Sequence, residues 1–576
     1  MDFGDEGGRD AMRSSIAVCF AGSGGAGAIT AGSTFLQSAA RAGYYGLMTK
    51  LSGAQVRGGE AAALVEIGVE PLDAQPDRFD VLIALDWDNV GKFAPELPMD
   101  SASIVLADPA AGKPAETIVA TGARLVDFPL AKLASDVKGR GNMVALGAAA
   151  ALAGIDSAAL EQSIRDLIGA KGEATIAASL AAVAAGADAA RQIESDIKLQ
   201  PGHPGRRWFG SGNEAIGLGA LRGGVRFVAA YPITPATEIT EWLAPRMGAV
   251  GGRAMLAEDE IAAINMAVGA SFGGVPSLTV TSGPGLSLKV ETIGLAISAE
   301  IPLVIVDVMR VGPSTGIPTK SDQGDLDLAL YGTHGDAPRI VLAPMSIADC
   351  ALTTERAVHL AESLQTPVFV LSDQSLGQTQ TIIDEPTRRA EPMTRAMESD
   401  KSGADFRRYQ PTADNVSPMP APGVEGRQWV AEGLSHDEFG HPSNAARFHV
   451  AGLNKRRDKL ENHDYGDIWG EATGEGETVI IAFGSSVGPV KEAARRLREQ
   501  GVAIKVVGLR LIAPIPKEQI AEAIKGARRV IVVAQNHTGQ LYRHLLGAKA
   551  LPAEAESLAR PGPAPFRPGE IAAHIA

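Results

Sequence analysis

The sequence predicts an α/β protein built from three α/β units in succession. Short apolar runs of strand length alternate with helical patterns along most of the 576 residues, and this alternation is typical of sheets covered by helices. Several of the runs are apolar without interruption, which favours parallel strands that are buried on both faces. The length agrees with this number of units at roughly 150 residues per domain.

The first unit is expected over residues 1–200. Its expected strands are Ile16–Ala21, Leu64–Val69, Val81–Asp86 and Ile104–Ala107. An alanine-rich helical stretch follows, and it ends where Pro and Gly crowd together around Gly202, as they do in linkers. We therefore place a domain boundary near Gly202.

The second unit is expected over residues 203–375. Its expected strands are Val225–Ala230, Ala254–Leu256, Leu278–Thr281, Leu303–Val308 and Val368–Leu371. Residues 376–470 are polar and include several prolines, which indicates a connecting arm. The alternation resumes over residues 471–576, which predicts a compact third unit.

Composition and charge exclude several classes of protein. Fifty-three basic and 67 acidic side chains give a formal net charge of −14 with no basic block, so we expect no nucleic-acid partner. Cys19 and Cys350 are the only cysteines, too few for a disulfide framework, a four-cysteine zinc site or a protein-held iron–sulfur cluster. Any such cluster must come from a partner, and we expect this chain to bind no metal.

The N-terminal stretch MDFGDEGGRD lacks the basic and then apolar order of a secretion signal. The longest apolar run, Met143–Ile155, is shorter than the roughly 20 residues that cross a bilayer. We therefore expect a cytoplasmic protein without a membrane segment. No nucleophile elbow, Walker A or kinase motif occurs in the sequence, so hydrolase and kinase functions are not supported.

A glycine-rich turn follows the first expected strand. The stretch GSGGAG places Gly22, Gly24 and Gly27 between a strand and a helix, where backbone amides can bind a phosphate. Arg57 in QVRGGE is a further candidate anion contact. No acidic residue closes the second strand region, YYGLMTK, so the dinucleotide fingerprint is incomplete. A phosphate-bearing ligand and a purely structural turn both remain open.

Polar residues follow the strands of the second unit. Thr234 follows the first strand, Glu258 and Glu260 follow the second, and Arg310 follows the fourth. A further strand-to-helix glycine loop, TSGPGLS, covers 281–287. Each residue alone has an ordinary alternative as a helix cap or a surface charge. Because parallel strands end at the same edge of a sheet, the set predicts a ligand site there.

The motifs YPITPATEI, AEDEIAAINMAVGAS, TSGPG, IVDVMRVGPSTGIPTKSDQGDL and YGTHGDAPR together resemble the alpha subunit of the 2-oxoacid:ferredoxin oxidoreductases, specifically the 2-oxoglutarate type. The front third, with GSGGAG and QVRGGE, resembles the Rossmann-like gamma domain of that family, fused ahead of alpha. The middle unit then corresponds to the pyrimidine-binding-type thiamine diphosphate domain. The stretch from VIIAFGSS to VVAQNHTGQLYRHL resembles its transketolase-C-terminal-like domain.

The resemblance implies a thiamine diphosphate enzyme divided between two subunits. The beta subunit is implied to carry Mg²⁺ with the diphosphate and a [4Fe–4S] cluster, and the whole is implied to be an (alpha–beta)₂ assembly. The implied reaction is the oxidative decarboxylation of 2-oxoglutarate, with coenzyme A accepting the acyl group and ferredoxin the electrons. Pyruvate, branched-chain and aryl 2-oxoacids remain alternative substrates, and a noncatalytic flavin- or nucleotide-binding module remains the alternative of another class.

Site residues follow from the same resemblance. The residues implied to hold the cofactor are Glu260, with Glu258 as the alternative, and Ser282, Gly283 and Pro284. The residues implied to hold the 2-oxoacid carboxylate are Thr234 and Arg310. The candidate CoA or phosphate contacts are Gly22, Gly24, Gly27 and Arg57. Glu260, Thr234 and Arg310 are the implied catalytic set. Lys289 departs from the pattern, because an apolar residue is expected at its position.

Overall fold

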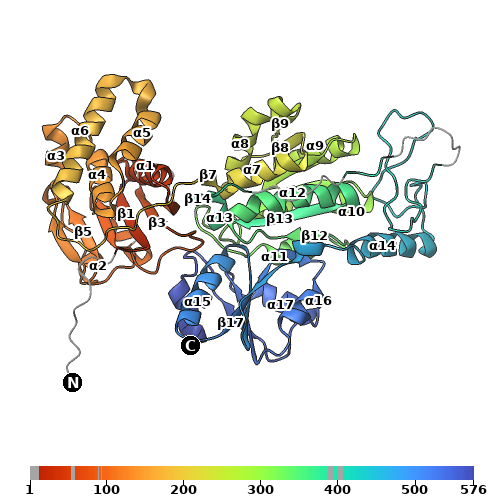
Figure 1. Ribbon diagram of the computed structural model, residues 1–576. Coiled ribbons are helices and arrows are strands. Elements are labelled where there is room, and N and C mark those ends of the chain that lie inside the picture. Colours follow the sequence, from red (N-terminus) through yellow and green to blue (C-terminus); the bar gives the residue numbers. More distant parts are fainter. Residues whose placement is uncertain (1–11, 54–58, 89, 93, 387–393, 398–405) are drawn as a thin grey trace. The chain divides into compact units, whose positions relative to one another are not determined.

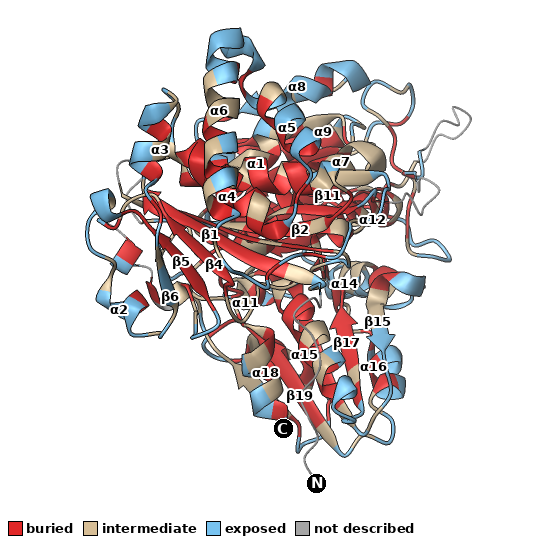
Figure 2. Cartoon of the chain, turned by 60° about the vertical axis from the view of Figure 1, so that its left-hand side comes forward, coloured by how far each residue is buried: buried red, intermediate tan, exposed pale blue. Residues whose placement is uncertain are grey.

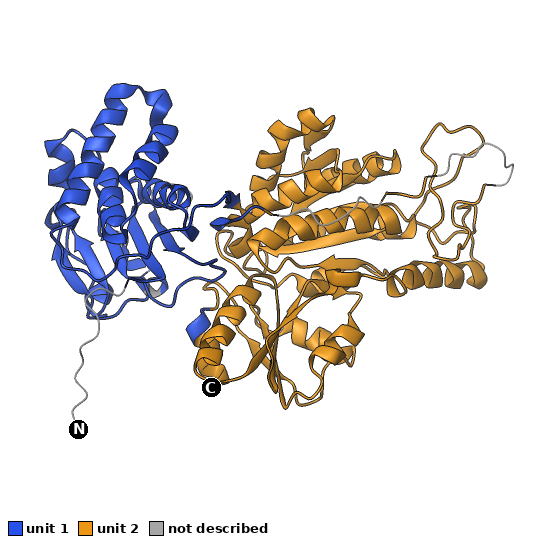
Figure 3. Cartoon of the chain, in the orientation of Figure 1, with its two compact units in different colours: residues 1–210, 379–385, 567–569 blue, residues 211–378, 386–566, 570–576 orange. Residues whose placement is uncertain are grey.

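The computed structural model describes residues 12–53, 59–88, 90–92, 94–386, 394–397 and 406–576. The chain forms two compact units, of which unit 1 comprises residues 1–210, 379–385 and 567–569, and unit 2 comprises 211–378, 386–566 and 570–576 (Figure 3). Across the described residues, three sheets with eight, seven and five strands are flanked by helices (Figure 1). The central strands of the sheets, such as β1 (Ser15–Ser23), β11 (Leu303–Met309) and β13 (Pro367–Asp373), are buried along nearly their whole length (Figure 2). The expected α/β class is confirmed.

Unit 1 contains the eight-stranded sheet. In spatial order its strands are β6 (Arg124–Asp127), β5 (Ile104–Ala107), β4 (Val81–Ala84), β1 (Ser15–Ser23), β3 (Glu60–Gly68), β2 (Tyr45–Ser52), β14 (Gln380–Asp384) and β7 (Arg207–Ser211). The pairs from β6 to β1 are parallel, whereas β3 is antiparallel to both β1 and β2. The connection between β2 and β3 is too short for a helical crossover, so this half of the sheet is antiparallel.

The helices of unit 1 are α1 (Ala28–Arg41), α2 (Glu116–Val119), α3 (Leu130–Asp136), α4 (Gly141–Ala153), α5 (Ser157–Ile168) and α6 (Glu173–Ala190). Small residues let α4 and α6 approach closely, because a Cβ on Gly147 or Gly186 would overlap the backbone of the opposite helix. Within the described residues, α6 has the length and apolar composition of a membrane span. The sequence predicts no membrane segment on the basis of uninterrupted apolar runs. Helix α6 is not such a run, because it includes scattered polar residues.

Unit 2 is organised around the seven-stranded sheet. In spatial order its strands are β18 (Leu511–Ala513), β12 (Ile340–Leu342), β13 (Pro367–Asp373), β11 (Leu303–Met309), β10 (Ser277–Thr281), β8 (Phe227–Ala230) and β9 (Arg253–Leu256). Its helices are α7 (Gly212–Gly223), α8 (Thr237–Met247), α9 (Glu260–Phe272), α10 (Gly283–Ser298), α11 (Leu326–Tyr331), α12 (Ile347–Leu364) and α13 (Gln374–Gln378). Every pairing is parallel except that of β12 with β18. The expected buried parallel strands are therefore present.

The five-stranded sheet is formed by the C-terminal part of unit 2. In spatial order its strands are β15 (Gly470–Thr473), β17 (Ile504–Leu509), β16 (Thr478–Phe483), β19 (Arg529–Ala534) and β20 (Glu556–Ala559). The helices of the C-terminal region are α15 (Val487–Glu499), α16 (Lys517–Ala523), α17 (Gln540–Gly547) and α18 (Pro568–Ile575). Apolar residues of both sheets, such as Phe369 and Phe483, share one core cluster.

This shared core changes the expected division of the chain. The sequence places a boundary near residue 470, but β18 lies C-terminal to it and pairs with β12 of the seven-stranded sheet. Because the two sheets share an apolar core and the C-terminal region adds β18 to the seven-stranded sheet, they form one compact unit. At the other expected boundary, near residue 375, the chain passes into β14, which joins the sheet of unit 1.

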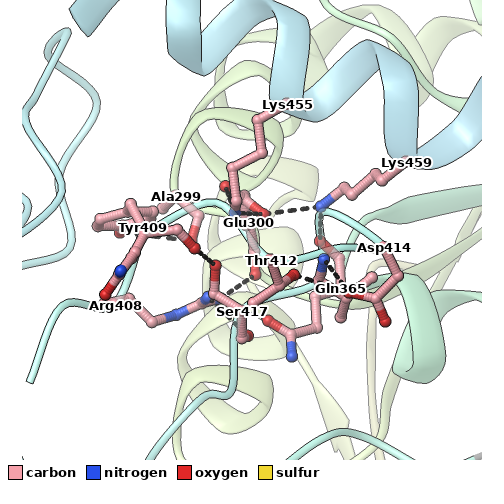
Figure 4. A network of polar contacts seen from close by, with 12 residues as sticks. Ala299, Glu300, Gln365, Arg408, Tyr409, Thr412, Asp414, Ser417, Lys455 and Lys459 are labelled. Atoms are coloured by element: carbon pink, nitrogen blue, oxygen red, sulfur yellow. Dashed lines mark hydrogen bonds and ion pairs between the residues drawn. The ribbon is translucent and has the colours of Figure 1, made fainter.

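The segment expected as a polar connecting arm ends in a long helix, α14 (Ala446–Glu461). Two of its lysines are buried and reach Glu300, which follows α10 (Figure 4). Lys455 Nζ donates to Glu300 Oε1 at 2.6 Å and Lys459 Nζ donates to Oε2 at 2.9 Å. The sequence pattern suggests that these charged residues lie at a solvated surface, but in the structure they are buried.

Arg408, also from this arm, completes the network. Its Nη2 donates to the main-chain oxygen of Glu300 at 2.9 Å and to Gln365 Oε1 at 2.7 Å. Burial by itself would raise the pKa of the Glu300 carboxyl, but Lys455, Lys459 and Arg408 hold this pKa well below its usual range. The ionised carboxylate thus compensates buried cations that would otherwise be very costly.

Candidate active site

Four loops that carry the candidate residues meet at one edge of the seven-stranded sheet. Strands β11, β10, β8 and β9 are neighbours in this order and run parallel. Arg310 follows β11, Ser282 follows β10, Thr234 lies in the loop after β8 and Glu260 follows β9. The carboxyl ends of parallel strands are where ligands bind in such sheets. The structure therefore brings the separately identified segments together.

Arg310 and Thr234 are in direct contact. Arg310 is buried, with 7% of its surface exposed, and its Nη1 donates a hydrogen bond to the main-chain oxygen of Thr234 at 2.6 Å. Thr234 itself is exposed, and its hydroxyl takes no part in this bond. Burial lowers the pKa of the Arg310 guanidinium, and the carboxyls of Asp325 and Asp307 oppose this shift.

Glu260 is the first residue of α9, as the sequence predicts, and it is buried with 8% of its surface exposed. Asp259 caps the helix by accepting a hydrogen bond from the Ala262 amide at 2.7 Å, which anchors the start of α9. The alternative candidate, Glu258, is exposed. Burial therefore distinguishes the two glutamates and favours Glu260 as a residue that contacts a ligand inside the protein.

The side chain of Glu260 lies over the first turn of α10. A Cβ on Gly285 would be only 2.8 Å from both Cγ and Oε1 of Glu260 and closer still to the Thr281 hydroxyl. Glycine at this position thus leaves the space that the carboxylate occupies. Within the described residues no side chain or amide donates a hydrogen bond to this carboxylate, which leaves its oxygens available to a ligand.

Lys289, which departs from the apolar pattern expected at its position, lies beside Glu260 in the structure. It is fully buried on α10, and its Nζ donates to the main-chain oxygen of Glu260 at 3.0 Å and to Thr279 Oγ1 at 3.2 Å. Burial lowers the pKa of Lys289 to about 8, while the charges of Glu260 and Asp259 oppose this. A lysine in an apolar helical pattern was the available sequence signal.

The loop between β10 and α10 contains the three other candidate cofactor contacts. Ser282 is fully buried and is the N-cap residue of α10 without a capping hydrogen bond from its side chain. Its Oγ has no partner among the described residues. Gly283 packs against the carboxylate of Asp325, and Pro284 is half-buried. An unpaired buried hydroxyl at a helix start is a feature that a polar ligand would satisfy.

The glycine-rich turn of unit 1 forms the expected strand–turn–helix. Gly22 lies at the end of β1, where a Cβ would come within 3.0 Å of Asp86 Oδ2. The Gly24 amide donates to the main-chain oxygen of Gly59 at 2.5 Å. Gly22 and Gly24 are therefore used within the protein itself, and Arg57 lies outside the described residues.

Gly27 is different, because it lines a cavity of about 690 Å³. Its φ of 91° is in the left-handed region, and a Cβ there would come within 2.5 Å of the Asn142 amide nitrogen, so both conformation and space require glycine. Two exposed cations, Arg140 and Lys171, line the same cavity and were not identified from the sequence. They offer positive charge to an anionic ligand.

The fold and the polar sheet edge together define a modular α/β protein of the kind that binds an organic cofactor at the ends of parallel strands. Three family models match the chain. The pyruvate flavodoxin/ferredoxin oxidoreductase, thiamine diP-binding model matches residues 218–454, the pyruvate ferredoxin/flavodoxin oxidoreductase model matches 17–189, and the pyruvate:ferredoxin oxidoreductase core domain II model matches 476–556.

Individual relatives agree with these matches. The 2-oxoglutarate synthase subunit KorA of Methanothermobacter marburgensis is 38% identical over 63% of this chain and 97% of its own length. The alpha subunit of 2-oxoacid:ferredoxin oxidoreductase 2 of Aeropyrum pernix is 31% identical over 73% of this chain and 71% of its own. The chain belongs to the 2-oxoacid:ferredoxin oxidoreductase family, which confirms the resemblance seen in the sequence.

A solved structure extends the likeness to the whole chain. The 2-oxoglutarate:ferredoxin oxidoreductase of Magnetococcus marinus, with 2-oxoglutarate, coenzyme A and succinyl-CoA bound, superposes with a TM-score of 0.91 at 35% identity. The alignment covers 98% of this chain and 99% of that one. Unit 1 and unit 2 therefore both have counterparts in one polypeptide of a known oxidoreductase.

Proposed function

We propose that this chain is the alpha subunit, with a fused gamma domain, of an enzyme that oxidatively decarboxylates 2-oxoglutarate to succinyl-CoA and CO₂ and passes the electrons to ferredoxin. The observation that carries the proposal is the sheet edge where buried Glu260 and Arg310 lie on neighbouring loops with Thr234 and Ser282. The full-length likeness to an oxidoreductase with 2-oxoglutarate and succinyl-CoA bound supports the choice of substrate.

The residues at this edge fit thiamine diphosphate. When bound, this cofactor supplies the carbanion that attacks the keto carbon and accepts the electrons left by decarboxylation. Glu260, whose side chain is buried, would hold its aminopyrimidine ring, and Ser282, Gly283 and Pro284 would line it. The orphaned Ser282 hydroxyl is the observation that supports this fit.

The protein's own part in the reaction is proton transfer and orientation. A carboxylate in the position of Glu260 can accept a hydrogen bond from a ring N–H and can hold or release that proton at Oε1 or Oε2. Arg310 presents a planar guanidinium fork to a planar carboxylate, which fixes the orientation of the 2-oxoacid. The Thr234 carbonyl holds this fork in place, and its exposed hydroxyl can donate to the same carboxylate.

Coenzyme A is assigned to the cavity of unit 1. The start of α1, with Gly27 at the N-cap, lines the cavity, where helix-start amides can bind a phosphate. Arg140 and Lys171 add positive charge for phosphate groups, and Asp86 and Asp108 line the same cavity. Arg57, which lies outside the described residues, stays a candidate contact on sequence grounds. Gly22 and Gly24 support the turn and are not assigned to the ligand.

The complete enzyme requires a beta subunit that provides Mg²⁺ and a [4Fe–4S] cluster. Cys19 and Cys350 are both buried, and burial raises the pKa of each thiol, so neither is suited to be a cluster ligand. We infer an (alpha–beta)₂ assembly in the cytoplasm with ferredoxin as electron acceptor. Neither nucleic acid nor a membrane is required for this function.

The decisive experiment is anaerobic viologen reduction by the chain purified with its native partner. Reduction that requires CoA and prefers 2-oxoglutarate over pyruvate, branched-chain and aryl 2-oxoacids supports the proposal. A preference for another acid would correct the substrate, and no reduction with any 2-oxoacid, together with a bound flavin, would favour the noncatalytic module.

A glutamate pair provides the matched variants. E260Q should lower kcat by about 10²-fold or more, because a carboxylate that exchanges a proton typically contributes 10²–10⁴-fold. E258Q changes an exposed side chain by the same chemistry and should retain normal turnover. Equal activity of the two variants would remove Glu260 from the reaction.

A further inference from the structure

The substrate end of the site contains two acidic side chains that the function above does not use. Asp307 lies on β11 and is in register with Thr281 of the neighbouring strand β10. Asp325 immediately precedes α11, and its Oδ1 and Oδ2 lie 2.5 and 2.6 Å from where a Cβ on Gly283 would be. Both carboxyls therefore lie at the sheet edge that carries Arg310.

Hydrogen bonds do not compensate these groups within the described part of the chain. Both oxygens of Asp307, Oδ2 of Asp325 and Nε of Arg310 are buried there without a partner. Asp307 is fully buried, and Asp325 is half-buried as a residue although its Oδ2 is enclosed. Because buried unpaired polar atoms are costly, the protonation of the two carboxyls and the charge of Arg310 depend on one another.

The balance depends on pH. Burial, followed by the charge of Asp322, raises the pKa of Asp325 to about 7, while Arg310 opposes this rise. Burial, followed by the neighbouring Asp325, raises the pKa of Asp307 well above its usual range. Near pH 6 Asp325 is mostly protonated, so the cluster keeps most of the positive charge of Arg310. Near pH 8 Asp325 is ionised and cancels that charge.

The other charged groups around the cluster do not replace the lost positive charge. Asp322 lies in the same loop as Asp325, and Asp373 on β13 acts on Asp322. Glu260 lies over the adjacent Gly285, and these three groups are all acidic. Lys289 interacts electrostatically with Glu260 and Asp259. Arg310 is thus the cation whose charge Asp325 controls.

We propose that Asp325, supported by Asp307, is a positioning residue that determines through its proton how strongly Arg310 attracts the 2-oxoacid carboxylate. The inference rests on the proposed function, since it concerns the residue assigned there to the substrate. When Asp325 is protonated, Arg310 presents its full charge to the substrate. When Asp325 is ionised, its negative charge offsets that of Arg310 and weakens the attraction of the substrate carboxylate. The KM for the 2-oxoacid therefore rises with pH, and kcat does not follow this ionisation.

The test measures KM and kcat for 2-oxoglutarate by anaerobic viologen reduction from pH 6.5 to 8.5. It uses the complete complex loaded with thiamine diphosphate. We expect the KM of the wild type to rise about tenfold over this range, which is within the limit of tenfold per pH unit that one ionisation sets. D325N cannot ionise at this position, so its KM should stay low and change less than twofold. A flat KM in the wild type overturns the inference without the need for any variant to fold.

A nearby aspartate serves as the control. Asp327 is two residues further along, on α11, and pairs at the surface with Arg543, so D327N should keep the pH profile of the wild type. A D325N profile that rises like that of the wild type overturns the inference while leaving the proposed function intact. Absence of turnover with every 2-oxoacid in the wild type would instead overturn the proposed function, and this inference with it.

Discussion

Replacing Gly285 by alanine should displace Glu260 and leave the rest of the protein folded. The added Cβ would lie 2.8 Å from Cγ and Oε1 of Glu260, whereas carbon atoms in contact are normally about 3.5–4.0 Å apart. Glu260 or α10 must therefore move by about 1 Å, the difference between these two distances. The Thr281 hydroxyl, on the fully buried strand β10, overlaps the added atom as well.

Two effects of different size follow from this displacement. Overpacking of this kind costs about 1–3 kcal/mol of folding free energy, partly offset by the roughly 0.5–1 kcal/mol that alanine gains over glycine within a helix. A misplacement of about 1 Å at a reacting group lowers turnover by about 10²-fold. We therefore expect a modest drop in the free energy of unfolding and a large drop in kcat.

Gly294→Ala on the same helix is the matched control. Gly294 is half-buried, and a Cβ there would meet nothing within 4 Å, so this variant should be slightly more stable and fully active. Thermal unfolding and anaerobic viologen reduction with saturating 2-oxoglutarate and CoA distinguish the two. If G285A retained the kcat of the wild type, the argument that the carboxylate must lie over the first turn of α10 would be refuted.

The remaining predictions concern the arm and the cavity of unit 1. E300Q should lower the free energy of unfolding at pH 7 by about 3–5 kcal/mol, because it leaves buried Lys455 and Lys459 uncompensated. The control variant E499Q, in an exposed pair with Arg495, should change it by less than about 0.5 kcal/mol. The pKa of Glu300 is lower in the folded state than its unfolded value of 4.5. Its contribution to stability is therefore complete above pH 4.5 and is lost as the pH falls toward the folded-state pKa. Chemical denaturation should show that the difference between E300Q and the wild type shrinks below about pH 4. R140A should raise the KM for CoA about tenfold, and more at low ionic strength, since it removes a charged phosphate contact, while K132A, on a surface lysine paired with Asp136, should not change it. An unchanged KM in R140A would place CoA elsewhere.

Local sequence patterns were enough to locate the principal candidates. Glu260 follows a short strand and opens a small-residue helix, and that pattern predicted its place at the edge of the sheet. Thr234 and Arg310 each follow a predominantly apolar strand, and parallel strands of this type end at a shared edge. Strand periodicity and helix-start signals depend on residues that are close together in the chain, so a single sequence is sufficient to locate these residues.

Only the tertiary structure decided which residues, distant in the sequence, lie together as buried charged groups. Glu300 is 155 residues from Lys455 along the chain, and no local pattern distinguishes that buried pair from a solvated surface. Asp325 follows an irregular loop, and its approach to Gly283 depends on how that loop lies against the start of α10. A buried charge is stable only beside its counter-charge, and long-range packing alone brings such partners together.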